Sequence, residues 1–171
     1  MRLASFDIET TGLRSTYNRT ICACFKFHDE TKVRAKIARY CKDEVALLDW
    51  IRDCWDEADL IVSWNGKLFD QRFVNGRRIQ KGLMPLDAKK MHKDIMYEAR
   101  SLRMTSCSLE NVGCNFGCKI PKIKLMAEEW VKAAEGNKQA HQRILDHCVN
   151  DVLLLQEVFE KLKPLIVRIN R

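Results

Sequence analysis

The first part of the chain alternates as β-strands joined by short connections do. Residues 3–8 run into a turn at 10–12, residues 20–27 form a second β-rich run, and residues 32–39 alternate apolar with charged side chains. Short connections between successive strands favour antiparallel pairing. The opening third therefore predicts a three-stranded antiparallel meander, which limits the fold to architectures that contain such a sheet.

Helix and strand patterns alternate after the meander. A helix that Asp43 can cap is predicted because apolar residues recur near one face: Val45, Leu48, Ile51 and Trp55. A buried strand over 59–64, a helix from about 68 to 82 and an edge strand over 93–96 follow, and residues 141–162 show the clearest helical periodicity. We expect an α/β fold whose mixed five-stranded sheet adds two parallel strands to the meander, with helices on both faces.

Length and composition bound the kind of protein. The chain has 171 residues, of which 46% are hydrophobic and 31% charged, which suits one folded domain and argues against disorder. No apolar run approaches the roughly 18 residues of a membrane span, and Asp7 comes too early for a secretory signal. We expect a single domain over residues 1–165 and a short basic tail over 166–171, in the cytoplasm or elsewhere inside the cell.

The eight cysteines are too few for a disulfide scaffold, and reduced thiols are the ordinary state inside cells. Two groupings could bind a metal: Cys22 with Cys24, and Cys107 with Cys114 and Cys118. Neither has the paired C-x2-C spacing of a zinc ribbon. Buried free thiols are therefore favoured over structural zinc.

The net charge of +7 is unevenly distributed. Residues 60–125 carry thirteen Lys or Arg residues against five acids, whereas residues 43–59 are strongly acidic. A one-sided basic surface fits a polyanion, and nucleic acid is the commonest polyanionic partner. A solvated basic face explains the same counts, so charge alone leaves both readings open.

Two acids lie at the end of the first predicted strand. Asp7 and Glu9 are two residues apart, so their side chains project from one face with α-carbons about 6.6 Å apart. Carboxylates aimed into one space repel each other unless a positive charge lies between them. Mg²⁺ and Mn²⁺ prefer such hard oxygen ligands. An Asp-x-Glu pair alone is weak evidence for a metal site.

A third acid follows the strand over 59–64. Asp70 comes after Asn65-Gly66, at the mouth of the next predicted helix, where the end of a neighbouring strand would bring it to the same sheet edge. An aspartate at a helix start also serves simply as a cap. Capping and metal binding both remain open for Asp70 on this evidence.

A histidine and an acid lie together on the last helix. His147 and Asp151 are four residues apart and therefore share a helix face, beside an apolar stripe. An acid beside a buried stripe needs a partner, which a metal ion supplies, although an exposed pair has the same spacing. His141 and Asp146 form a rival pair with a spacing of five.

In this order, three segments resemble the motifs of the DEDD (DnaQ-like) 3′–5′ exonuclease superfamily: residues 6–13 (FDIETTGL), 65–70 (NGKLFD) and 147–152 (HCVNDV). Residues 108–113 (SLENVG) resemble a helix found between the second and third motifs, particularly in family B polymerase proofreading domains and YprB-like predicted exonucleases. The resemblance covers residues 1 to about 162 and implies an RNase H-like fold. It is closest to the DEDDy, YprB-like branch, with His147 where that branch normally has tyrosine.

The resemblance implies a metal-dependent 3′–5′ exonuclease that releases mononucleotides from single-stranded DNA ends with two divalent cations, Mg²⁺ or Mn²⁺. It implies metal ligands at four acids: Asp7, Glu9, Asp70 and Asp151. It also implies that His147 orients or deprotonates the attacking water. Asp151 is preferred to Asp146 because the helix continues after it as the family's does.

The family further implies which residues hold the strand end: Thr10, Thr11, Leu13, Asn65 and Phe69. Leu13 and Phe69 could equally be core residues, and the threonines could only shape the turn. Basic residues between 77 and 124 would follow the phosphates. An exoribonuclease of the same fold, an RNase H-type or resolvase-type endonuclease and a binding module with a weakened site are the alternatives. A separate polymerase or replication protein is a possible partner.

Overall fold

The computed structural model describes residues 1–120 and 123–166. Its sheet has five strands in the order β3-β2-β1-β4-β5. The strands are β1 (Leu3–Thr10), β2 (Thr20–Phe27), β3 (Arg34–Ile37), β4 (Leu60–Ser63) and β5 (Met91–Asp94). Strands β1, β2 and β3 pair antiparallel, whereas β4 pairs parallel with both β1 and β5. The predicted fold class is confirmed.

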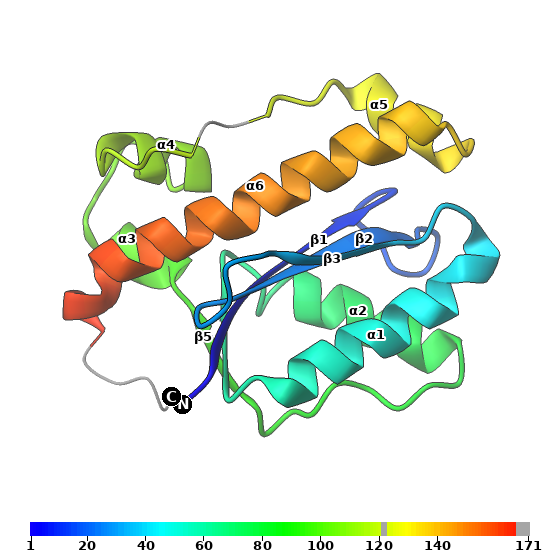
Figure 1. Cartoon of the computed structure of the whole chain (residues 1–171), viewed down its shortest axis with the longest axis horizontal. Helices are drawn as coiled ribbons and strands as arrows, with labels where there is room; N and C mark the ends of the chain where they lie inside the picture. Colours follow the sequence, from blue (N-terminus) through cyan, green and yellow to red (C-terminus); the bar gives the residue numbers. More distant parts are fainter. Residues whose placement is uncertain (121–122, 167–171) are drawn as a thin grey trace.

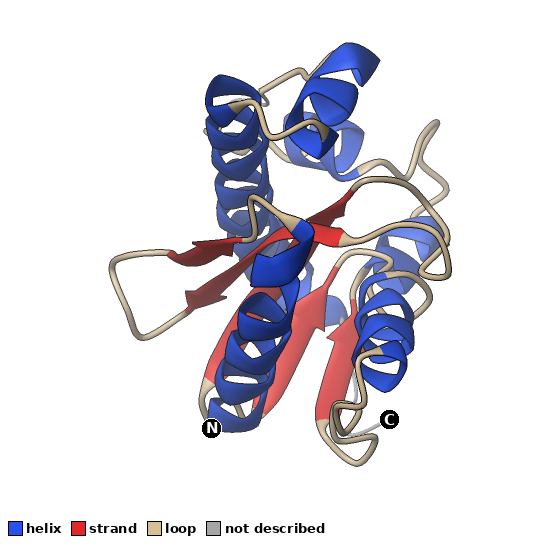
Figure 2. Cartoon of the chain, turned by 90° about the vertical axis from the view of Figure 1, so that its right-hand side faces the viewer, coloured by secondary structure: helices blue, strands red, loops and turns tan. Residues whose placement is uncertain are grey.

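Helices cover both faces of this sheet. They are α1 (Glu44–Glu57), α2 (Asp70–Gln80), α3 (Met96–Ser101), α4 (Leu109–Asn115), α5 (Ala127–Ala134) and α6 (Lys138–Leu162), with 3-10 turns at Cys41–Asp43 and Lys163–Leu165. Figure 1 shows α6 along one face and α1 and α2 on the other, and Figure 2 shows the sheet between these layers. In the described part of the chain, no helix is both long and apolar enough to cross a bilayer.

Strand β1 alternates as predicted, with one face toward α1 and α2. Phe6 packs there against Phe25, with ring centroids 4.6 Å apart, and edge-on against Trp55 at 5.6 Å. On the opposite face, Cys22 and Cys24 belong to a buried cluster with residues of α6. Every residue of β2 is buried because helices pack on both of its faces. The cysteines are free thiols, and Cys22, Cys24, Cys54 and Cys148 are buried.

Helix α1 buries Leu48, Ile51 and Trp55 as predicted, but not Val45. Val45 is exposed, and Glu44 is fully buried. The Glu44 carboxylate accepts a hydrogen bond from the Thr20 backbone N–H at 2.9 Å and pairs with the Arg77 guanidinium at 2.6 Å. At the start of the helix the inward position is therefore taken by the paired Glu44 rather than by Val45. The buried ion pair joins α1, α2 and the start of β2.

Two short helices were not predicted. Helices α3 and α5 span too few turns to show helical periodicity clearly in the sequence. Strand β5 also lies two residues before its predicted position. Of the predicted basic tail over 166–171, all but Ile166 lies outside the described residues. The single domain over residues 1–165 stays a prediction.

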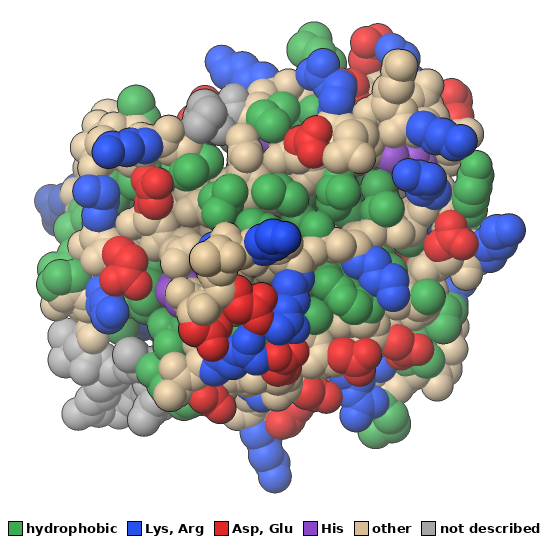
Figure 3. All heavy atoms as spheres, in the orientation of Figure 1, with side chains coloured by type: hydrophobic (Ala, Val, Ile, Leu, Met, Phe, Trp, Pro, Cys, Tyr) green, Lys and Arg blue, Asp and Glu red, His purple; other side chains and the backbone are tan. Residues whose placement is uncertain are grey.

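The basic residues after position 76 do not form one free surface. Arg77 pairs with Glu44, Lys93 pairs with Glu98, and the buried Arg78 donates to the carbonyls of Leu48 and Met84. On the face drawn in Figure 3, acidic and basic side chains are interspersed. Part of the positive charge counted in the sequence is therefore engaged in contacts within the protein and is not available to a ligand.

A buried histidine joins β4 and β5 to α2. The His92 Nδ1–H donates to the Gln71 side-chain carbonyl at 3.1 Å, and Nε2 accepts from the Ser63 hydroxyl at 2.7 Å. The ring also packs edge-on against Trp55, with centroids 5.2 Å apart. Burial and, to a lesser extent, the Lys67 charge lower the pKa of His92 to about 3. The native protein therefore holds this imidazole neutral.

We expect His92 to reduce native stability as the pH falls from about 6.5 toward 3. Over this range the unfolded chain takes up a proton that native His92 does not, so acid favours unfolding by about 3 kcal/mol between pH 7 and pH 4. Urea unfolding of wild type and His92→Gln at a series of pH values measures this. The difference between the two proteins removes contributions from other titrating groups. A difference that stays constant with pH would contradict a neutral native His92.

Candidate active site

Strand β1 continues beyond the end of β4, and Asp70 occupies the place beside it. The β1–β4 pairing ends at Ser5, which leaves the following residues of β1 without a strand on that side. There the Ile8 backbone N–H donates to Asp70 Oδ1 at 3.2 Å. Asp70 is the first residue of α2 and is 4% exposed. The start of α2 thus carries a buried carboxylate to the carboxyl end of β1.

Helix α6 approaches the same point from the opposite face of the sheet. The Cys148 thiol lies 3.4 Å from Asp7 Oδ2 and donates to it. His147 Nε2 lies 3.5 Å from Glu9 Oε1 and 3.5 Å from Asp151 Oδ2. Asp7 and Glu9 on β1, Asp70 on α2 and Asp151 on α6 are therefore brought together at one edge of the sheet.

The imidazole of His147 is held in one tautomer. Its Nδ1 lies 2.7 Å from the Ile123 carbonyl oxygen, which can only accept a hydrogen bond. Nδ1 therefore carries a hydrogen, and Nε2 faces the carboxylates of Glu9 and Asp151; in the neutral form of the ring, Nε2 carries the lone pair. The side chain is buried, so its orientation is fixed from both ends.

The carboxylates raise one another's proton affinity. Burial raises the pKa of Asp7 well above its usual range, and repulsion from Asp70, Asp151 and Glu9 raises it further. Burial raises the pKa of Asp70 to about 7, against the lowering effect of its backbone hydrogen bonds. A positive charge placed among these groups would relieve the repulsion and favour the ionised forms.

The donor set matches hard divalent cations. Within residues 1–120 and 123–166, no group of three or more His, Cys, Asp or Glu side chains is arranged as it would be around a bound metal ion. Four acids nevertheless meet at this edge, and their mutual repulsion is what bound Mg²⁺ or Mn²⁺ would offset. The residues therefore fit divalent cations by charge and by ligand chemistry.

The loop between β4 and α2 is fixed by an acid that the motifs did not reveal. The Asp94 carboxylate accepts hydrogen bonds from the backbone N–H groups of Asn65, at 2.9 Å, and Lys67, at 3.2 Å. Asn65 has a φ of 62°, and a Cβ on Gly66 would lie 2.5 Å from Ser63 Cβ. Asn65-Gly66 is thus needed for the tight turn that places Asp70.

The residues expected to hold a strand end divide into two kinds. Thr10 donates its hydroxyl to the Gly12 carbonyl at 2.8 Å, and the Thr11 hydroxyl accepts from the Arg19 N–H at 3.0 Å, so both shape the turn. Leu13 is 82% exposed and is not a core residue. Phe69 is half-buried and lies against Phe73, with ring centroids 5.6 Å apart.

A cavity of about 400 Å³ opens beside the carboxylates. Its lining comprises Ile8, Glu9, Thr10, Thr11, Gly12, Leu13, Phe69, Ala127 and Trp130. The Trp130 indole N–H donates to Glu9 Oε2 at 3.3 Å. Trp130 lies on the unpredicted helix α5, 121 residues from Glu9 in the sequence. No sequence pattern indicates that the two side chains are in contact.

The rival pair on α6 lies away from this cluster. Asp146 is exposed and accepts a hydrogen bond from Gln142. His141 is buried, and its Nδ1–H donates to the Asn137 carbonyl at 2.8 Å. The geometry therefore places His147 and Asp151, rather than His141 and Asp146, beside β1.

Comparison with known proteins agrees with this architecture. The structure of the family B DNA polymerase from the hyperthermophilic archaeon Pyrobaculum calidifontis matches with a TM-score of 0.75 at 19% sequence identity. The match covers 97% of this chain but only 25% of the polymerase chain, and at this identity it is a likeness of fold. No curated protein matches the sequence. The model of the RNase_H superfamily matches residues 4–163, and the chain therefore belongs to this superfamily.

Proposed function

We propose that this protein is a metal-dependent 3′–5′ exonuclease that releases mononucleotides from single-stranded DNA ends. The observation that carries the proposal is the meeting of Asp7, Glu9, Asp70 and Asp151 beside His147 at one edge of an RNase H-like sheet. The open cavity next to Glu9 gives a strand end access to this edge.

The four acids would hold two divalent cations. When bound, these cations supply an activated water and stabilise charge on the leaving 3′ oxygen. His147 Nε2 faces the same space with its lone pair and accepts a proton from the attacking water, while Ile123 keeps the ring in the required tautomer. Leu13 and Phe69 contact the terminal base from the cavity wall, and the turn formed by Thr10 and Thr11 holds Leu13 in place.

A digestion assay tests the proposed reaction. DNA and RNA strands of one sequence, labelled at the 5′ end, are incubated with Mn²⁺ or with EDTA. We expect a ladder of DNA shortened one nucleotide at a time, and no products in EDTA. The same ladder from RNA alone would make the protein an exoribonuclease, and internal cuts would indicate an endonuclease. Intact strands in every arm would contradict nuclease activity and indicate a binding module.

The polymerase match suggests a biological setting. A domain of this fold matches a quarter of a DNA polymerase chain, so we propose that the protein acts near a separate polymerase or replication protein. Co-purification with a polymerase from the source cells tests this association.

We expect substitutions of Trp130 to separate two contributions to the site. Trp130→Phe keeps an aromatic wall but removes the N–H that Glu9 accepts, so Mn²⁺ affinity falls several-fold while thymidine monophosphate binding is retained. Trp130→Ala also removes the wall and weakens nucleotide binding by a further fewfold to about tenfold. Calorimetric titration with Mn²⁺ and with the nucleotide measures both. If Trp130→Phe and Trp130→Ala weakened Mn²⁺ binding and nucleotide binding to the same extent, the two contributions would not be separate.

A further inference from the structure

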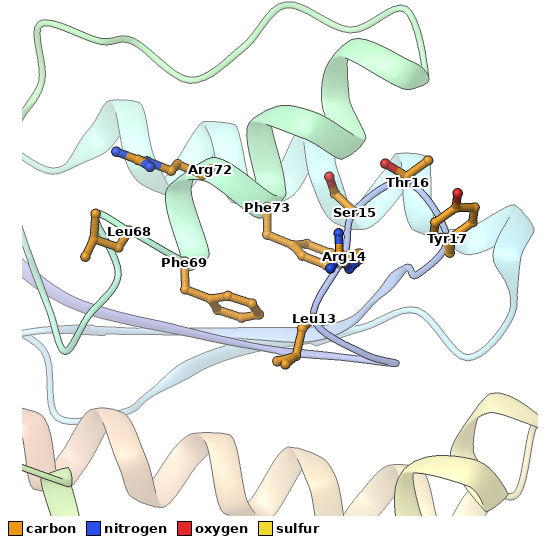
Figure 4. A pocket seen from close by; sticks show the side chains of 9 residues that line it. All are labelled: Leu13, Arg14, Ser15, Thr16, Tyr17, Leu68, Phe69, Arg72 and Phe73. Carbon is orange, nitrogen blue, oxygen red and sulfur yellow. The ribbon is translucent and has the colours of Figure 1, made fainter.

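A second cavity adjoins the one beside the carboxylates. It has a volume of about 410 Å³ and is lined by Leu13, Arg14, Ser15, Thr16, Tyr17, Leu68, Phe69, Arg72 and Phe73. Leu13 and Phe69 line both cavities, so they stand between them. In Figure 4 the Phe69 ring points toward Leu13, with loop residues 13–17 on one side and α2 on the other. The two cavities form consecutive compartments that share one wall.

The charge of the second cavity is uncompensated. Its lining includes two arginines and no acid. Among the described residues, neither the Arg14 nor the Arg72 guanidinium has an ion pair or a side-chain hydrogen bond, whereas Arg2, Arg34 and Arg77 are all paired with carboxylates. Figure 4 shows Arg14 near Phe73 and Arg72 extending toward the Leu68 end. Two exposed guanidiniums beside aromatic rings suit phosphate and base together.

The loop that carries half of this lining is internally braced. The Arg14 carbonyl accepts from the backbone N–H groups of Tyr17, at 3.1 Å, and Asn18, at 3.0 Å, and also from the Asn18 side-chain amide at 3.0 Å. A Cβ on Gly76 of α2 would lie 2.5 Å from Ser15 Oγ, so the loop packs tightly against α2. Yet Leu13 and Tyr17 are 82% and 84% exposed. A braced loop that exposes apolar side chains loses little conformational entropy when they bind a ligand.

We propose that this second cavity binds the nucleotides upstream of the terminal one, with Arg14 and Arg72 contacting backbone phosphates of a single strand. The proposal rests on the proposed function, because the first cavity must take the strand end. A base in the second cavity lies against Phe69 or Tyr17, which needs an unpaired and unstacked strand. The phosphate path therefore runs over loop 13–17 and α2, rather than over the basic residues after position 76, of which Arg77 and Lys93 are paired internally.

Binding measurements in the Asp7→Asn background, which keeps the strand intact, test this path. The ligands are fluorescein-labelled oligothymidylate and thymidine monophosphate, each titrated at several salt concentrations. We expect Arg14→Ala with Arg72→Ala to weaken oligothymidylate binding about tenfold or more. The slope of the logarithm of the binding constant against the logarithm of the salt concentration should fall in magnitude by about 1.4, because two phosphate contacts are lost. Monophosphate binding changes less than about twofold, because that ligand occupies only the first cavity.

The matched control is Lys32→Ala with Lys89→Ala. This variant also removes two exposed positive charges that have no side-chain partner among the described residues, but both lie at the opposite end of the sheet, in the β2–β3 turn and before β5. We expect it to bind both ligands as the Asp7→Asn parent does. Equal weakening by the two double variants, equal losses for both ligands, or no oligonucleotide binding at all would overturn the proposal.

The outcomes also separate the two proposals. If the wild type shortens strands but the arginine variant binds them normally, the second cavity is wrong and the exonuclease stands. If the wild type leaves every strand intact but the arginine variant alone loses oligonucleotide binding, the second cavity stands as a binding site and the exonuclease is wrong.

Discussion

We expect Asp7→Asn to lower the rate of phosphodiester hydrolysis about a thousandfold or more and to raise the thermal stability of the cation-free protein. Asp7 is buried, and repulsion from Asp70, Asp151 and Glu9 adds to the effect of burial in raising its pKa. An asparagine keeps the shape and still accepts from the Cys148 thiol, but it removes the charge that repels the other acids. The same substitution removes one of the carboxylates that would hold the proposed cations.

The sign of the pH dependence follows from the raised pKa values. Native Asp7 and Asp70 bind their protons more tightly than the unfolded chain does, so they stabilise the cation-free protein at acid pH. This stability is lost as the pH rises from about 4 through about 7, the folded pKa of Asp70. Bound Mn²⁺ restores it by favouring the ionised carboxylates. We expect Mn²⁺ to raise the unfolding temperature of wild type and to raise that of Asp7→Asn far less.

Thermal unfolding in EDTA and in Mn²⁺, beside the digestion assay, measures both effects. Asp146→Asn is the matched control, because Asp146 is an exposed acid on α6 outside the cluster. It should keep the wild-type rate and the wild-type response to Mn²⁺. Wild-type hydrolysis by Asp7→Asn would place the catalytic site elsewhere in the chain.

The sequence predicts best where an element has a strong period. Strand β1 alternates apolar with polar residues from Ala4 to Glu9, and α6 repeats apolar residues through most of its turns, so the acids on them could be located in advance. Asp70 could be placed because it follows a buried strand and a tight Asn-Gly turn. The edge where these elements meet then follows from the topology of the sheet.

The rest of the site depends on contacts that no local pattern records. Trp130 lies on a short helix and reaches Glu9 across 121 residues of sequence. Asp94 ends β5, whose buried residues are the polar His92 and Asp94, so no apolar pattern marks it, and it holds the loop before α2. Glu44 looks like a surface acid at a helix start but pairs internally with Arg77. Counting basic residues likewise could not distinguish a buried guanidinium such as Arg78 from a free one such as Arg72.

We expect His147→Ala to slow hydrolysis about a hundredfold or more, because it removes the group positioned to accept the proton of the attacking water. The Ile123 carbonyl holds Nδ1–H, so the Nε2 lone pair faces the acids and cannot turn away. Loss of this base should also flatten the dependence of the rate on pH. The rate is measured at saturating Mn²⁺ and strand, which keeps weaker binding from contributing.

His147→Tyr distinguishes a base from a spacer. A phenol fills the pocket and has a proton-accepting oxygen, but it ionises only near pH 10. We therefore expect partial recovery of the rate with its optimum moved to higher pH, and no recovery from His147→Phe, which fills the pocket without a titrating group. If phenylalanine restored the rate as well as tyrosine, His147 would serve to pack α6 against β1. The pH profile thus decides between proton transfer and packing, because only proton transfer requires the lone pair that the Ile123 contact leaves free.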